Sequence, residues 1–255
     1  MKDIRLIAAA TLSLALIAVA RADAGPPAVH LWDTLKRLRS PVELAQRDAW
    51  HAATPDLQGD LVVETDAAGA AFASGLGAVL VYSTAAPSSR RAEVRPVEIH
   101  GERVTLATTV VEQSGTVMVR ADFRAPGGSS VPIAFSFTGD RILAITPQAA
   151  ARGVTVTAPM ELAMVPSFVG EDLLFDPHDY LSAKTLSLPS EHVLVGLLRG
   201  EGSLLVMTWQ QEAPGAQLAL DHRAPERDSI TAATLTGGAG LSLAVLDAPG
   251  ISPHA

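Results

Sequence analysis

The sequence contains no cysteine, which excludes disulfide bonds, thiolate chemistry and a lipoprotein anchor. Aromatic residues make up only 4% of the 255 residues, so a wide aromatic platform for carbohydrate is not expected. Charged residues are also few, at 18%, whereas hydrophobic residues reach 48%. This composition excludes disorder as a description of the whole chain. Stability must therefore come from a hydrophobic core or from a bound ion.

Long hydrophobic runs are absent except at the N-terminus, where Leu6 to Ala20 follows the short charged segment Met1–Arg5. Ala22 and Ala24 then form an Ala-x-Ala cleavage site. This order predicts a secretory signal peptide over residues 1–24, with no membrane span after cleavage. We expect a periplasmic or secreted protein. The final residues, 248–255, contain no closing element, which leaves open whether the chain is the N-terminal part of a longer protein.

The charge balance is acidic. Cleavage after Ala24 would leave 16 basic and 25 acidic side chains, a net charge of −9 with histidine neutral. A chain of this charge is not expected to bind nucleic acid or an anionic membrane surface.

Residues 25–58 are interpreted as a linker followed by a helical segment. Val29–Arg39 could form a short helix with leucines on one face. Ser40, Pro41 and Glu43 predict a second helix start, because Ser40 can cap, Pro41 suits the first position and Glu43 completes a capping box. We expect this helix to run to about Ala52, with Leu44 and Trp50 facing inward.

From Gly59 onward, apolar and polar residues alternate with a period of two, and turn residues recur every 8–12 positions. This pattern predicts an all-β fold, an antiparallel β-sandwich or supersandwich over residues 59–250, preceded by the short helical segment. No strict repeat is present. The expected strands are 61–64, 78–82, 92–100, 103–111, 116–123, 131–137, 141–145, 153–157, 161–165, 192–198, 203–209, 216–220, 229–235 and 241–246.

The first strands of this region, with Val62–Thr65, Ala71, Gly75, Gly77 and Val79–Tyr82, resemble the beginning of galactose-mutarotase-like β-supersandwich domains. The later segments Val165–Asp172 and Leu188–Glu191 look like those of exported bacterial proteins. The resemblance implies a carbohydrate-related function, as a binding or a processing domain. The Asn-His-aromatic segment of the sugar epimerases is missing from the first half, so the resemblance does not imply mutarotase activity.

Residues 166–192 interrupt the alternation and carry the densest polar cluster. Its members are Glu171, Asp172, Asp176, His178, Asp179 and Tyr180. A histidine beside carboxylates and a tyrosine suits acid–base chemistry on sugars, which makes His178, Tyr180 and Glu171 the catalytic candidates. The remaining carboxylates suit a ligand or a hard cation such as Ca²⁺, although no EF-hand spacing is present. The alternative is a solvated loop in which Asp176 starts a turn.

Three further residues are candidates for ligand binding. Trp209 ends an apolar strand next to three polar residues, so its ring could stack on a sugar while the amides bond the hydroxyls; the alternative is a core position. Glu191 and His192 precede another apolar strand and could face one cavity; the alternative is that Ser190 and Glu191 are simply the entry to that strand. No His-x-His or HExxH pattern supports zinc. The sequence therefore predicts a carbohydrate-related protein without a required cofactor, and leaves open an enzyme, a non-catalytic envelope module and the oligomeric state.

Overall fold

The architecture is that of a computed structural model, which describes residues 28–89, 91–99, 104–113, 116–139, 142–148, 150–166, 172–189, 192–200, 202–209, 215–222 and 228–247. The strands are β1 (His30–Asp33), β2 (His51–Ala52), β3 (Leu61–Glu64), β4 (Ala68–Ala73), β5 (Ala78–Ser83), β6 (Arg91–Pro96), β7 (Thr105–Gln113), β8 (Thr116–Arg124), β9 (Ser130–Phe137), β10 (Leu143–Pro147), β11 (Gly153–Val165), β12 (Leu173–Phe175), β13 (Thr185–Ser187), β14 (Val193–Leu198), β15 (Ser203–Trp209), β16 (Ala216–Asp221), β17 (Ser229–Thr236) and β18 (Leu241–Asp247). Three 3₁₀ turns, η1 (Pro41–Ala45), η2 (Arg47–Ala49) and η3 (Pro177–Tyr180), complete the described elements.

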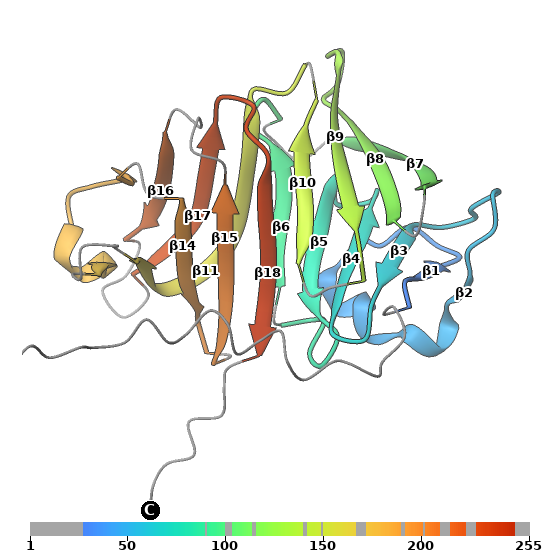
Figure 1. The fold of residues 1–255 in the computed structure, drawn as a ribbon, viewed down its shortest axis with the longest axis horizontal. Helices are drawn as coiled ribbons and strands as arrows, with labels where there is room; N and C mark the ends of the chain where they lie inside the picture. Colours follow the sequence, from blue (N-terminus) through green and yellow to red (C-terminus); the bar gives the residue numbers. More distant parts are fainter. Residues whose placement is uncertain are drawn as a thin grey trace, which may run out of the picture.

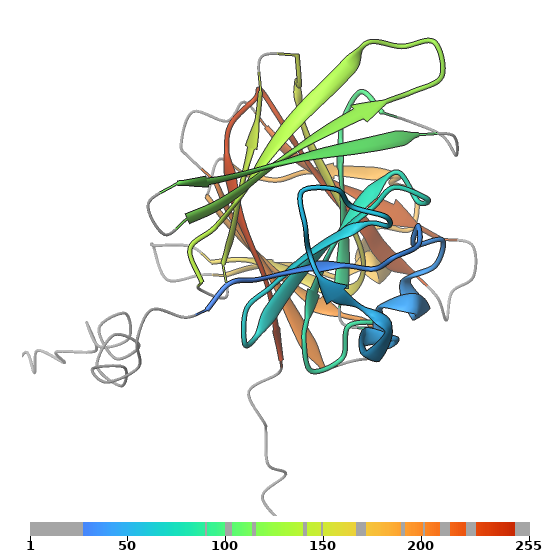
Figure 2. The same ribbon diagram turned by 90° about the vertical axis from the view of Figure 1, so that its right-hand side faces the viewer.

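The strands form two antiparallel layers (Figures 1 and 2). In the first layer the order is β1-β3-β4-β5-β6-β11-β17-β16-β13, with β2 added beside β1. In the second layer the order is β7-β8-β9-β10-β18-β15-β14-β11-β12. The predicted all-β antiparallel sandwich is therefore confirmed.

One long strand belongs to both layers. The first half of β11 pairs with β6 and β17, and its second half pairs with β14 and β12. The pairing is irregular between Thr157 and Met160, where Pro159 stands. Because proline cannot donate to a ladder, a change of partners at this point costs little. The sequence pattern had predicted two separate strands here, 153–157 and 161–165.

The main core fills the space between the layers. Alternate residues of each strand point inward, and a contact typical of this core is the edge-to-face pair of Phe72 in β4 and Phe135 in β9, with ring centroids 5.3 Å apart. Both rings are at most 1% exposed. Truncating such a side chain to alanine typically costs about 3–5 kcal/mol.

A second, smaller core lies on the opposite face of β3, β4 and β5. Leu38, Leu44 and Trp50 cover this face, and all three are buried. The predicted capping box at Ser40 and Glu43 is present, but the segment forms the short 3₁₀ turns η1 and η2 rather than an α-helix to Ala52. The chain leaves helical geometry after Ala49, and Trp50 is already extended, because the next two residues pair with β1 as β2.

The helix considered for Val29–Arg39 is wrong. His30–Asp33 forms β1 and pairs antiparallel with β3, and Leu35 then adopts a left-handed conformation with φ of 59°. Pairing with the free edge of β3 satisfies the backbone groups of this segment better than an isolated helical turn would. Residues 30–58 therefore pack against the sheet that the sequence placed after residue 59.

Two buried aspartates hold residues 30–58, the covering segment, in place. The Asp33 carboxylate accepts hydrogen bonds from the backbone N–H groups of Leu35, Gln58 and Gly59, at 2.7–2.8 Å. Although burial opposes it, these N–H donors lower the pKa of Asp33 below its usual value. The Asp60 carboxylate accepts from Leu38 N–H at 2.7 Å, and burial raises the pKa of Asp60.

Candidate functional site

A row of paired residues, all polar except one glycine, crosses five neighbouring strands on the outer face of the first layer. Cross-strand pairing places His30 opposite Glu64, Glu64 opposite Gly69, Gly69 opposite Tyr82, and Tyr82 opposite Arg91. Directly paired residues point to the same face of a sheet. Leu38, Leu44 and Trp50 of the smaller core pack on this same face. The row therefore lies at the edge of that core.

Glu64 is the centre of the row. Its side chain is 2% exposed, which is unusual for a carboxylate and requires partners. The Tyr82 hydroxyl donates to Glu64 Oε1 at 2.7 Å, and the Arg47 guanidinium forms an ion pair with Oε2. Burial and the adjacent Glu64 carboxylate raise the pKa of Tyr82 well above its usual value, so the phenol stays a hydrogen-bond donor.

Gly69 makes the contact between Tyr82 and Glu64 possible. The Tyr82 ring lies across Gly69, and a Cβ at this position would stand 2.7 Å from the Tyr82 hydroxyl oxygen. Only glycine leaves room for an aromatic ring directly over the backbone of the middle strand. Strand β3 therefore supplies the acceptor Glu64, and β5 supplies the donor Tyr82. Between them, β4 leaves room for the ring at Gly69.

Arg47 reaches Glu64 from the covering segment. It begins η2, directly after the capped turn η1, and its side chain is 43% exposed. The backbone bonds made by Asp33 and Asp60 fix the path of this segment over the sheet. The guanidinium therefore closes one side of Glu64 while keeping an open side toward solvent.

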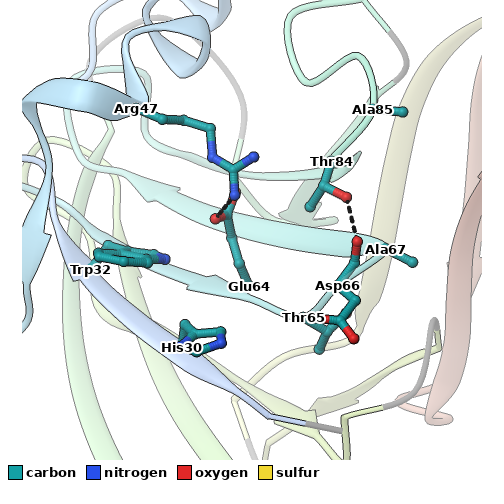
Figure 3. A pocket seen from close by; sticks show the side chains of 9 residues that line it. All are labelled: His30, Trp32, Arg47, Glu64, Thr65, Asp66, Ala67, Thr84 and Ala85. Atoms are coloured by element: carbon teal, nitrogen blue, oxygen red, sulfur yellow. Dashed lines mark hydrogen bonds and ion pairs between the residues drawn. The ribbon is translucent and has the colours of Figure 1, made fainter.

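An aromatic pair forms the wall beside Glu64. Trp32 and His30 lie on the same face of β1, with ring centroids 6.0 Å apart and an interplanar angle of 27°. The Trp32 indole N–H is buried and has no hydrogen-bond partner among the described residues. Figure 3 shows both rings on the same side of Glu64, with the guanidinium of Arg47 above. A buried donor without a partner is costly unless a ligand or water meets it.

The opposite wall is the turn between β3 and β4. Thr65 closes this turn through its backbone and hydroxyl bonds to Ala68, and the Thr84 hydroxyl donates to the Asp66 carbonyl at 3.0 Å. The Asp66 side chain is exposed at the rim. The turn is therefore held at both ends, and its polar groups face the aromatic pair across the opening (Figure 3).

These walls enclose an open pocket of about 580 Å³. It combines an aromatic face, a fixed carboxylate, a guanidinium and threonine hydroxyls. Such a set offers donors and acceptors in fixed positions together with an apolar surface, as small-molecule sites typically do. No group of three or more metal-ligating side chains occurs within the described residues.

The loop that carries the densest polar cluster in the sequence has a different character. Its described part contains β12, η3 and β13, and it connects β11 to β14 at the end of the sandwich away from β1 (Figure 1, orange). Within it, β12 pairs with β11 and β13 pairs with β16. Asp176 caps η3 by accepting from His178 N–H at 2.9 Å, and its carboxylate also contacts His178 Nδ1 at 2.7 Å. Both side chains are about half exposed, at 46% and 57%.

The other candidates of this loop are placed as follows. Asp172 and Asp179 are exposed, and Tyr180 is partly buried with its ring stacked on Phe175 at 6.5 Å. Glu171 and Glu191 lie outside the described residues. The loop thus brings Asp176 and His178 together, and the roles predicted for these residues stay predictions.

Trp209 and His192 are neighbours at one end of β14 and β15. The backbone N–H of Trp209 donates to the backbone carbonyl of His192 at 3.0 Å. Trp209 itself is 9% exposed and belongs to the main core. The position matches the core alternative for Trp209. The ligand roles predicted for both residues are not tested by this placement.

The residues of the pocket were not identified from the sequence as a site. In the sequence, Val62–Thr65 and Tyr82 show only the strand pattern that resembles a β-supersandwich domain. A signal was nevertheless present, because an acidic residue at the end of a strand that is otherwise apolar on both faces must find buried partners. Trp32, His30 and Arg47 carry no such signal, since their approach depends on how the covering segment folds.

Comparisons with known proteins give few matches. No family model matches the chain, and no curated protein does. Among solved structures, the chain is similar to alpha-N-acetylgalactosaminidase NagBb from Bifidobacterium bifidum. The ligand-free structure shares 13% identity at a TM-score of 0.39, covering 74% of this chain and 33% of that chain. The quadruple mutant shares 9% identity at 0.39, covering 86% and 35%.

The chain thus spans about a third of the length of those structures. The similarity is too low to carry a conclusion about function, and the predicted resemblance to galactose-mutarotase-like domains stays a prediction.

Proposed function

We propose that this protein is exported and binds a carbohydrate, without transforming it, in the pocket formed by Trp32, His30, Glu64 and Arg47. The observation that carries this proposal is the buried Glu64 carboxylate beside an aromatic pair whose Trp32 indole N–H is buried without a hydrogen-bond partner among the described residues. An aromatic ring can cover the C–H face of a sugar, while the fixed polar groups bond its hydroxyls.

Binding is favoured over catalysis by the way Glu64 is held. One carboxylate oxygen already accepts from Tyr82 and the other pairs with Arg47. A carboxylate fixed in this way orients hydroxyl donors well, because each oxygen keeps a second lone pair for a ligand. Glycoside cleavage typically needs two carboxyl groups on either side of the bond that breaks, and the second acidic residue of this pocket, Asp66, lies exposed at its rim.

Export rests on the N-terminal sequence. The charged start, the apolar run from Leu6 to Ala20 and the small residues at Ala22 and Ala24 form a signal peptide pattern. Among the residues that the structure describes, no helix is long and apolar enough to cross a membrane. The proposed location is the periplasm or the extracellular medium.

The test is a glycan array probed with the purified full-length protein after signal cleavage, followed by calorimetric titration of the glycans that bind. Trp32→Phe keeps the ring but removes the indole N–H, and Glu64→Gln keeps the shape but removes the charge. We expect each change to weaken binding by about tenfold, which corresponds to the loss of one hydrogen bond to a ligand.

The matched control is His178→Ala, which removes an exposed ring from the loop at the other end of the sandwich. It should leave glycan affinity unchanged. Absence of any bound glycan would retire the proposal in favour of a structural envelope module. Release of reducing sugar from a bound glycan, measured in parallel, would replace binding by processing. Loss of binding in the loop variant alone would move the site to residues 172–189.

A further inference from the structure

The strand β7 forms an open edge of the second layer. It pairs with β8 over all nine of its residues, and no other strand pairs with it among the residues that the structure describes. The other terminal strands differ. β12 and β13 are three residues long, and β1 is partly covered by β2. An edge as long as β7 leaves a row of unpaired backbone N–H and C=O groups.

Most of this edge lacks the usual protection, since Glu112 is the only charged residue of β7. From Thr105 to Val111 the sequence is Thr-Leu-Ala-Thr-Thr-Val-Val, without a charged residue or a proline. Natural sheets normally blunt an exposed edge with lysine, proline, a bulge or a very short strand. A long and regular edge whose single charged residue stands next to its end is instead suited to accept a further strand.

A groove runs beside this edge. Its apolar part, about 460 Å³, lies between Thr108–Val110 of β7 and a wall that includes Leu31, Leu57 and Leu61. It adjoins a second hollow of about 400 Å³, which begins at Thr105–Thr108 and extends toward Arg37 and Asp60. Leu31, Leu57 and Val110 are only partly buried, although they pack against the main core. The apolar surface at this end is therefore incompletely covered.

The two layers end at different places. β7 lies over β4, whereas β3 and β1 continue the first layer beyond it. With strands about 4.8 Å apart, the first layer extends roughly 10 Å past the edge of β7. Figure 2 looks onto this end, with green β7 above blue β1. The groove thus occupies the place where the second layer would have its next strand.

This overhang decides which occupant fits. A second copy of the chain that paired its own β7 with this one would bring its overhanging β1 and β3 into the same space. A single extended segment meets no such obstacle, since it would lie beside β7 and over Leu31 and Leu61. Its inward side chains would face an apolar wall, and its backbone would meet the unpaired groups of β7.

The register identifies the backbone groups that would receive it. Gln113 pairs with Thr116 across a two-residue connection, and in such hairpins the closing pair is hydrogen-bonded. Because hydrogen-bonded and non-bonded pairs alternate, Thr109 bonds to β8, whereas Thr108 and Val110 direct their backbone groups outward. Thr108 also lines both parts of the groove.

We propose that β7 is a docking edge for an extended segment of another polypeptide, uncharged and apolar at every second residue, which adds as the next strand of the second layer. This site is separate from the proposed carbohydrate pocket, which lies on the opposite face of β3. The pocket and the docking edge can therefore fail or succeed independently.

The test is selection of a random heptapeptide display library on the purified full-length protein, followed by titration of the selected synthetic peptides. We expect enrichment of sequences with apolar residues at alternate positions. Thr108→Pro removes a backbone N–H that points away from β8, and it should lower the affinity for the selected peptides at least tenfold. Thr108→Val keeps the N–H and the strand propensity, so it should bind as the unaltered protein does.

A second measurement does not depend on how well the proline variant folds. Peptide binding should slow amide hydrogen exchange at Thr108 and Val110 in the unaltered protein, while exchange at Thr109 stays the same. Methylation of every second backbone nitrogen of the peptide should abolish binding when the methylated groups face β7. It should spare binding when they face away from β7. Enrichment without alternation, equal binding to Thr108→Pro, or dimerisation of the protein through β7 would each overturn the proposal.

Discussion

The pocket at β1–β5 and the loop at residues 172–189 are opposites in how they hold charge. In the pocket, Glu64 is nearly fully buried and is met by a tyrosine and an arginine from distant parts of the chain. In the loop, Asp176 and His178 are two residues apart and about half exposed. The loop is richer in ionisable residues. Of these two carboxylates, Glu64 is the one held in a fixed position by two partners.

The difference shows that the density of polar residues along a chain is a weak guide to a site. Neighbours in sequence can satisfy each other locally, as Asp176 and His178 do, and such an arrangement suits a turn. A buried carboxylate needs partners that only tertiary structure can supply.

The largest effect is expected at Glu64. Glu64→Ala leaves the buried Tyr82 hydroxyl without its acceptor and opens a cavity, so the free energy of unfolding should fall by about 3 kcal/mol. In urea unfolding, the double variant with Tyr82→Phe should lose less than the sum of the single changes, because the phenylalanine no longer needs an acceptor. Strict additivity would show that the two side chains are not coupled.

A smaller loss is expected at Gly69. Gly69→Ala places a methyl group against the Tyr82 ring, and overpacking of this kind costs about 1–3 kcal/mol. The matched control is Gly128→Ala, whose Cβ would meet nothing closer than 3.4 Å and should change stability by less than about 0.5 kcal/mol. Equal thermal shifts for the two variants would mean that Tyr82 is free to move away.

The third prediction concerns acid. The pKa values of Asp33 and Asp176 both lie below the usual value of 3.8, through backbone N–H donors at Asp33 despite its burial and through His178 at Asp176. A lowered carboxyl pKa contributes stability that is present above the unfolded value and is lost as the pH falls toward the folded value. Asp33→Asn should flatten the acid limb of the unfolding curve, and Asp176→Asn should flatten it less, because Asp176 is exposed. An equal change in both would contradict the contrast between the regions.

The smallest effect is expected in the loop. Asp176→Ala removes the cap of a short 3₁₀ turn, and the free energy of unfolding should fall by about 1 kcal/mol or less. His178→Ala should change it still less, since its ring is more than half exposed. Chemical denaturation of both variants beside Glu64→Ala provides the direct comparison. A loop variant as unstable as the pocket variant would show that this loop is held more firmly than its exposure indicates.

Much of the sheet could be predicted because strand patterns are local. Alternation in residues 116–123 and 131–137 matches β8 and β9, and the turn residues between them are visible in the sequence. The capping box at Ser40 was also correct, since it involves only neighbouring residues. The helix considered for Val29–Arg39 failed because the free edge of β3 offers that segment a better partner, and no local pattern reports such an edge.

The amino-acid sequence alone determined an antiparallel β protein with glycine turns, because alternation and turn chemistry act over a few residues. Tertiary structure decided that β11 joins both layers, that Glu64 meets Tyr82 and Arg47, and that the first layer extends beyond β7. Each of these depends on which distant strands become neighbours, and that choice is made by the packing of the whole core.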